Sequence, residues 1–119
     1  MITEEALAAH VRATLAGTGT ITEIRMFGGL GFMLNGNMVA AVSKRGLLLR
    51  VGRDSYAAAL GRLGARPMEM RGRPLQGYVR VDPAELTKAS LKAWLREAAA
   101  FVATLPPKSA GRRVRGKQV

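Results

Sequence analysis

The sequence predicts one α+β domain in which helices pack against an antiparallel sheet. Apolar residues recur at helical spacing near the start, the middle and the end of the chain. Four strand-like segments lie between the first and second of these regions, and two lie between the second and third. No strand–helix–strand repeat occurs, so a parallel doubly wound sheet is not expected. The 119 residues, 48% of them hydrophobic, suffice for one core and not for two.

The first helix is predicted to begin after Thr3, a good N-cap that is followed by two glutamates. Leu7, Val11 and Leu15 then recur every four residues and make one apolar face. The glycines that follow end the helix.

The next part of the chain is predicted to form a sheet, with strands over residues 21–27, 32–34, 38–42 and 47–51. Asn35-Gly36 lies between two apolar runs, which indicates a hairpin with a type I′ turn. A second turn ends at Gly46. We therefore expect the last three of these strands to form an antiparallel meander.

A short second helix is expected over residues 53–63, capped by Asp54 or Ser55 and with one apolar face formed by Tyr56, Leu60 and Leu63. Strands are predicted at 66–70 and 77–81, with a loop over 71–74 between them. Pro67 indicates that the first of this pair is an edge strand or begins there.

The last helix has the clearest start signal, with Asp82 as cap and Pro83 at the first helical position. Thr87 is a second candidate cap, which allows a break after Leu86. The apolar stripe that follows predicts a buried, structural Trp94; it comprises Leu91, Trp94 or Leu95, Ala98, Phe101 or Val102, and Leu105. We expect residues 1–105 to form the domain and residues 106–119 to be a disordered basic tail.

The net charge of +11 indicates affinity for anions, and its densest part is the C-terminal tail. The basic residues there are Lys108, Arg112, Arg113, Arg115 and Lys117, with no acid among them. Such a segment can contact nucleic-acid phosphates, but without an aromatic residue it cannot stack on bases. The alternative is a solvated end with no ligand.

Catalytic and metal-binding chemistry finds little support in the sequence. There is no cysteine, and His10 is the one histidine. The eight acidic residues show no metal-ligand spacing. We therefore predict no catalytic residue, no metal and no cofactor, and a protein that is not an enzyme.

Residues Gly28 to Gly31 raise the alternative of a phosphate-binding loop. The cluster lacks the closing Gly-Lys-Ser/Thr and runs into a strand instead of a helix. A bend between strands that exploits the conformational freedom of glycine is favoured. With no signal peptide and no long apolar run, a cytoplasmic protein without a membrane segment is expected.

One motif resembles a known family. Between about residues 3 and 105 the chain is similar to the N-terminal domain of the TfoX/Sxy family, first of all at Arg25, Met26, Phe27, Gly28, Gly29 and Gly31. The Asn35-Gly36 hairpin, Gly77-Tyr78 and the segment around Trp94 fit the same pattern. The resemblance implies an α+β domain without catalytic residues.

The resemblance also implies a role in regulating natural competence, as a coactivator with the cyclic-AMP receptor protein. Full-length relatives usually add a helical C-terminal domain. Two hypotheses follow for this chain. In the first it is a regulatory or adaptor domain that binds a protein partner, such as a transcription factor, while the tail contacts nucleic acid loosely. In the second it binds a small molecule or nucleotide at the Gly28–Gly31 bend. A homodimer is compatible with the sequence.

Overall fold

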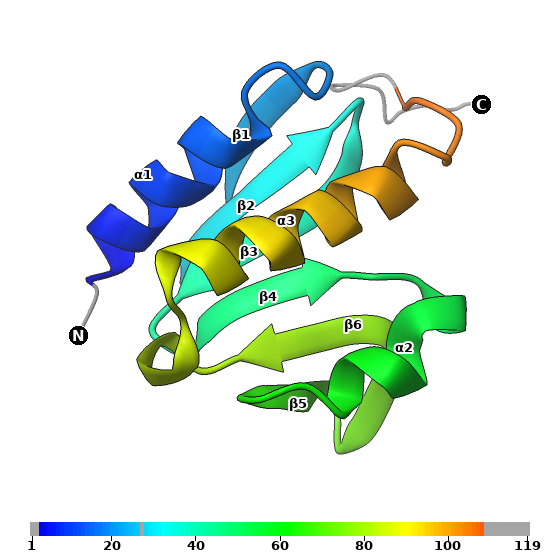
Figure 1. Cartoon of the computed structure of the whole chain (residues 1–119). Helices are drawn as coiled ribbons and strands as arrows, with labels where there is room; N and C mark the ends of the chain where they lie inside the picture. Colours follow the sequence, from blue (N-terminus) through cyan, green and yellow to red (C-terminus); the bar gives the residue numbers. More distant parts are fainter. Residues whose placement is uncertain (1–2, 27, 109–119) are drawn as a thin grey trace.

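The computed structural model describes residues 3–26 and 28–108. The elements run in the order α1 (Glu4–Leu15), β1 (Ile21–Met26), β2 (Gly29–Leu34), β3 (Asn37–Ser43), β4 (Gly46–Arg50), α2 (Arg53–Leu60), β5 (Ala65–Met70), β6 (Arg73–Val81), a 3-10 helix η1 (Pro83–Glu85) and α3 (Lys88–Val102). This is the predicted order with one short 3-10 helix added. The α+β class is confirmed (Figure 1).

The strands form one antiparallel sheet in the order β1-β2-β3-β4-β6-β5. All of the first four strands belong to the meander, so it includes β1 as well as the three strands predicted. Asn35 and Gly36 both have positive φ, as a type I′ turn requires. Pro67 lies in β5, which is an edge strand, as predicted.

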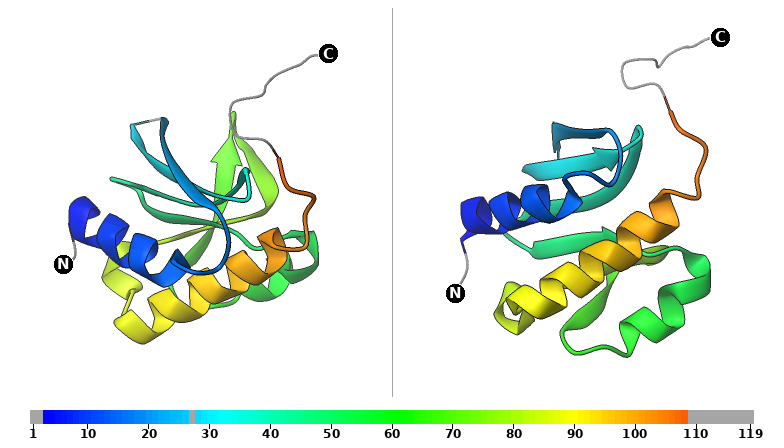
Figure 2. Two further views of the ribbon diagram at one scale, coloured as in Figure 1. Left: turned by 90° about the horizontal axis from the view of Figure 1, so that it is seen from above. Right: turned by 45° about the horizontal axis from the view of Figure 1, so that its top comes forward.

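The three described α-helices gather on one face of the sheet, and none of them lies on the other face (Figure 2). The core lies between the two layers. Leu7, Val11 and Leu15 of α1 are buried there, as their spacing predicted. Trp94 of α3 is only 2% exposed, which confirms the prediction that it is a core residue.

The second helix is shorter than predicted. It ends at Leu60, with Gly61 as C-cap, and Leu63 is 79% exposed instead of completing an apolar face. Its N-cap is Gly52, which has no side chain to bond the first turn, so Asp54 and Ser55 lie inside the helix and are not its caps. The cause at the C-terminal end is the turn that begins at Gly61, which takes Leu63 away from the core.

Two other boundaries also differ from the prediction. Arg71 joins Gly72 in positive φ, so a two-residue turn replaces the predicted loop and β6 begins at Arg73. Strand β2 begins at Gly29 and not at Phe32, because Gly29 already pairs with Met26.

The last helical segment is interrupted after Leu86, at the break that the second candidate cap, Thr87, allowed. Asp82 caps only the 3-10 helix, with its side chain accepting from the N–H of Ala84. Thr87 then caps α3 in a capping box with Ser90.

The chain that follows α3 stays against the β2–β3 hairpin as far as it is described. The amide of Lys108 donates to the carbonyl of Asn35 at 2.8 Å, and the side chain of Asn37 donates to the carbonyl of Pro106 at 2.9 Å. Residues 109–119 lie outside the described residues, so a disordered tail and the division of the chain after residue 105 stay predictions.

Candidate functional site

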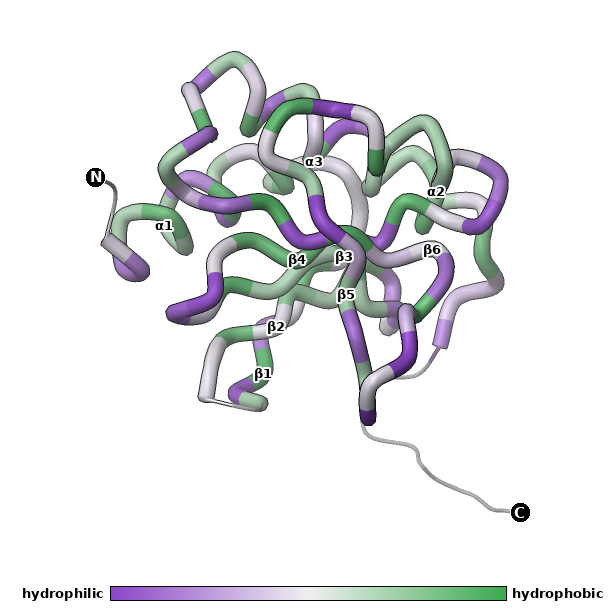
Figure 3. Tube along the Cα trace, turned by 90° about the horizontal axis from the view of Figure 1, so that it is seen from below, coloured by the Kyte–Doolittle hydropathy of each residue, from purple (hydrophilic) through white to green (hydrophobic). Residues whose placement is uncertain are grey.

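The face of the sheet opposite α1, α2 and α3 is called here the helix-free face, because none of the described helices covers it. Figure 3 shows it from another direction, with the helices on one side of the strands. In β4, Leu47 and Leu49 are fully buried under the helices, so Leu48 and Arg50 between and beyond them point to the opposite side. Antiparallel partners share a face, so Tyr78 and Arg80 of β6 also lie on the helix-free face.

The part of this face over β1 to β3 is apolar. Ile24 is 49% exposed and pairs with Gly31 in β2, on the side away from the core. Met33 and Met38 pair with each other across β2 and β3 and are half-buried. We call Ile24, Met26, Met33 and Met38 the apolar patch. Methionine side chains adapt their shape, and exposed apolar patches often mark interaction surfaces.

The part over β4 to β6 is basic. Arg66 and Arg80 are directly opposite each other in β5 and β6. Arg50 lies at the end of β4, with its guanidinium carbon 5.6 Å from the centre of the Tyr78 ring and 6.0 Å from that of Phe101 in α3. Burial lowers the pKa of the Arg80 guanidinium, and the nearby charge of Arg45 lowers it further. The cations at this end of the sheet therefore repel one another.

Elsewhere two arginines are neutralised by acids. Arg12 of α1 forms a bidentate pair with Glu23 of β1, with nitrogen–oxygen distances of 2.5 and 2.8 Å. This hydrogen bond lowers the pKa of Glu23 and raises that of Arg12. Arg62 pairs with Glu97 of α3. The first pair ties α1 to β1, and the second ties the turn after α2 to α3; on the helix-free face, Arg66 pairs with Asp82 at 3.4 Å.

The family motif lies at the β1–β2 hairpin. Gly28 has positive φ in the turn, and Gly29 has no room for a Cβ atom because the backbone of Val42 approaches it. A Cβ on Gly31 would meet the Met26 sulfur at 2.9 Å. Gly28 thus serves the turn, and Gly29 and Gly31 serve close packing, which favours the structural interpretation of this cluster. Phe27 lies outside the described residues, and Arg25 is exposed on the edge strand.

The predicted nucleic-acid-binding residues fall almost entirely outside the described part of the chain. Lys108 is described and exposed; Arg112, Arg113, Arg115 and Lys117 are not. Their role in binding nucleic acid stays a prediction.

Within residues 3–26 and 28–108, no group of three or more His, Asp or Glu side chains is placed to hold a metal ion. His10 is half-buried on α1. None of the described helices is long and apolar enough to cross a membrane.

Sequence reasoning missed the arginines that converge on the helix-free face. A signal was present in β6, where Tyr78 and Arg80 alternate with the buried Val79 and Val81. Such alternation indicates a strand with one face turned to solvent. What the sequence could not indicate is that Arg45, Arg66 and Arg80 come together, because they belong to three separate segments.

Comparison with known proteins supports the family resemblance. No curated protein matched the sequence. The TfoX N-terminal domain family matches residues 13–102, which is most of the described chain. The chain belongs to the TfoX N-terminal domain family.

Proposed function

We propose that this chain is a non-catalytic regulatory domain that binds a protein of the transcription apparatus through its helix-free face. The observation that carries the proposal is the apolar patch, on a face that none of the described helices covers. Membership of the TfoX N-terminal domain family supports a regulatory role.

The chemistry of the face suggests what kind of partner fits it. The apolar patch offers Ile24 and flexible methionines, which can pack against an apolar centre of varied shape. On the same face, Arg80 and Arg66 lie beyond β4, on β6 and β5. A complementary partner therefore has an apolar centre with acidic groups beside it, because opposite potentials guide association and suppress wrong partners.

The tail adds a second, weaker contact in this proposal. Five basic side chains between Lys108 and Lys117 neutralise phosphates of nearby nucleic acid without reading its sequence. The domain would then act as a coactivator, holding its partner at a promoter while the tail touches DNA.

A site-specific photo-crosslinker tests the partner surface. Benzoylphenylalanine replaces Ile24 in the apolar patch, and the matched control carries it at Lys92, which is exposed on α3 at the opposite side of the molecule. We expect crosslinks from position 24 to a transcription factor or RNA polymerase subunit, which persist after nuclease treatment. Crosslinks that are equal from both positions, or that join only two copies of this chain, would overturn the proposal.

A further inference from the structure

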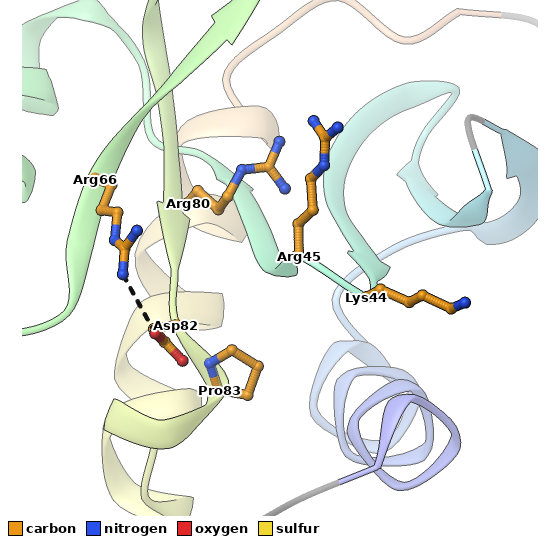
Figure 4. A pocket seen from close by; sticks show the side chains of 6 residues that line it. All are labelled: Lys44, Arg45, Arg66, Arg80, Asp82 and Pro83. Atoms are coloured by element: carbon orange, nitrogen blue, oxygen red, sulfur yellow. Dashed lines mark hydrogen bonds and ion pairs between the residues drawn. The ribbon is translucent and has the colours of Figure 1, made fainter.

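A basic pocket lies on the helix-free face where the β3–β4 turn meets β5 and β6 (Figure 4). Its volume is about 160 Å³, and it is lined by Lys44, Arg45, Arg66, Arg80, Asp82 and Pro83. Four of these six residues are basic and one is acidic. The pocket is separate from the apolar patch, which lies over β1 to β3.

The one carboxylate of the pocket is already engaged. One oxygen of Asp82 accepts from the guanidinium of Arg66 at 3.4 Å, and the other accepts from the amide of Ala84 at 3.0 Å. Among the described residues, no carboxylate lies within ion-pair distance of Arg45 or Arg80. Figure 4 shows the head groups of these two arginines side by side, while Lys44 points away from them.

This arrangement carries an electrostatic cost in the free protein. Arg66 and Arg80 are cross-strand partners, and like charges directly opposite one another destabilise a sheet. Arg80 is also half-buried, and its pKa is lowered by burial and by the charge of Arg45. An anion placed between Arg45 and Arg80 would offset the repulsion between these two charges.

We propose that this pocket binds a phosphate group through the guanidinium groups of Arg45 and Arg80. Arginine presents a planar fork of N–H donors that matches two phosphate oxygens at once. A cavity of about 150 Å³ accommodates benzene, so this pocket has room for a phosphate group but not for an entire nucleotide. Because of this volume, the rest of the ligand remains outside the pocket.

The phosphate belongs to a small phosphorylated ligand or to a nucleic-acid backbone, and titrations distinguish these sources. Sodium phosphate and a short DNA duplex are each added to the full-length protein at constant ionic strength, because screening alone shifts exposed signals. Amide and arginine side-chain signals of residues 45 and 80 are followed by NMR. We expect saturable shifts with inorganic phosphate. If DNA uses the pocket, phosphate competes with the duplex; if it does not, the ligand is small.

Matched variants locate the binding. Arg80→Gln and Arg45→Gln each remove one unpaired charge, and Arg96→Gln removes an exposed charge from α3 as control. Removing one charge-assisted hydrogen bond weakens phosphate binding by about tenfold, whereas the control retains wild-type affinity. Arg45 is exposed in a turn, so its variant folds even if Arg80→Gln does not. The proposal would be overturned if neither phosphate nor DNA produced saturable shifts. It would also be overturned if both pocket variants bound phosphate like the control.

The proposed phosphate site and the proposed partner surface can be tested independently of each other. Ile24→Glu alters the apolar patch and leaves the lining of the pocket intact. This variant should therefore bind phosphate like the wild type.

Discussion

Replacing Trp94 with alanine tests the core directly. The side chain is 2% exposed, and the guanidinium carbon of Arg62 lies 3.5 Å from the centre of its ring. A buried tryptophan removes about 150–250 Å² from water, which at about 25 cal/mol per Å² corresponds to about 4–6 kcal/mol. Alanine retains part of this buried area, and the cavity that the indole leaves collapses only partly. We therefore expect the free energy of unfolding to fall by about 3–5 kcal/mol.

Urea unfolding followed by far-UV circular dichroism measures this loss, since Trp94 is the sole tryptophan and fluorescence disappears with it. For a domain of this size each kcal/mol lowers Tm by about 4–8 °C, so the variant should melt at least about 12 °C lower. Leu63→Ala is the matched control. Leu63 is 79% exposed, so its truncation should change stability by no more than about 0.5 kcal/mol. A Trp94→Ala protein that unfolds like this control would refute the core assignment.

Three further perturbations have defined outcomes. Gly36→Ala forces a left-handed backbone on alanine and should cost about 1–2 kcal/mol or more in urea unfolding, whereas Gly61→Ala, with ordinary φ and room for a Cβ, should be neutral or slightly stabilising. Glu23→Gln should lower Tm near pH 7, because the hydrogen bond from Arg12 lowers the pKa of Glu23 and the ionised carboxylate therefore stabilises the folded state. The deficit in Tm should shrink as the pH falls through the folded pKa of Glu23, and a deficit that does not change with pH contradicts this. Deleting residues after Pro107 should flatten the salt dependence of DNA binding by about 0.9 in slope for each phosphate that the tail neutralises, equally for two unrelated duplexes, and an unchanged slope would show that the tail does not touch DNA.

Local signals predicted most of the secondary structure. The Asn35-Gly36 turn, Thr3 as a cap and the periodicity of α1 depend on neighbouring residues, and all were confirmed. The prediction was wrong where two local signals competed. The helical spacing of Leu63 favoured a longer α2, but the turn at Gly61 ends the helix.

The candidate site depended on long-range pairing, which local patterns do not specify. Strand β4 pairs with β6 and not with β5, and this crossover brings Arg80 beside the β3–β4 turn that carries Arg45. Alternation along β6 predicts that Arg80 faces away from the core. It does not predict which other charges share that face.

A comparison of transcripts tests most directly the claim that this domain regulates through its helix-free face. In the organism that encodes the protein, the chromosomal copy is replaced by Ile24→Glu, by Lys92→Glu or by a deletion, and protein levels are checked. Ile24→Glu places a charge in the apolar patch, while Lys92→Glu changes charge on exposed α3. We predict that Ile24→Glu reproduces the transcript changes of the deletion and that Lys92→Glu matches the wild type. A deletion that alters transcripts while Ile24→Glu leaves them at wild-type levels would contradict the account.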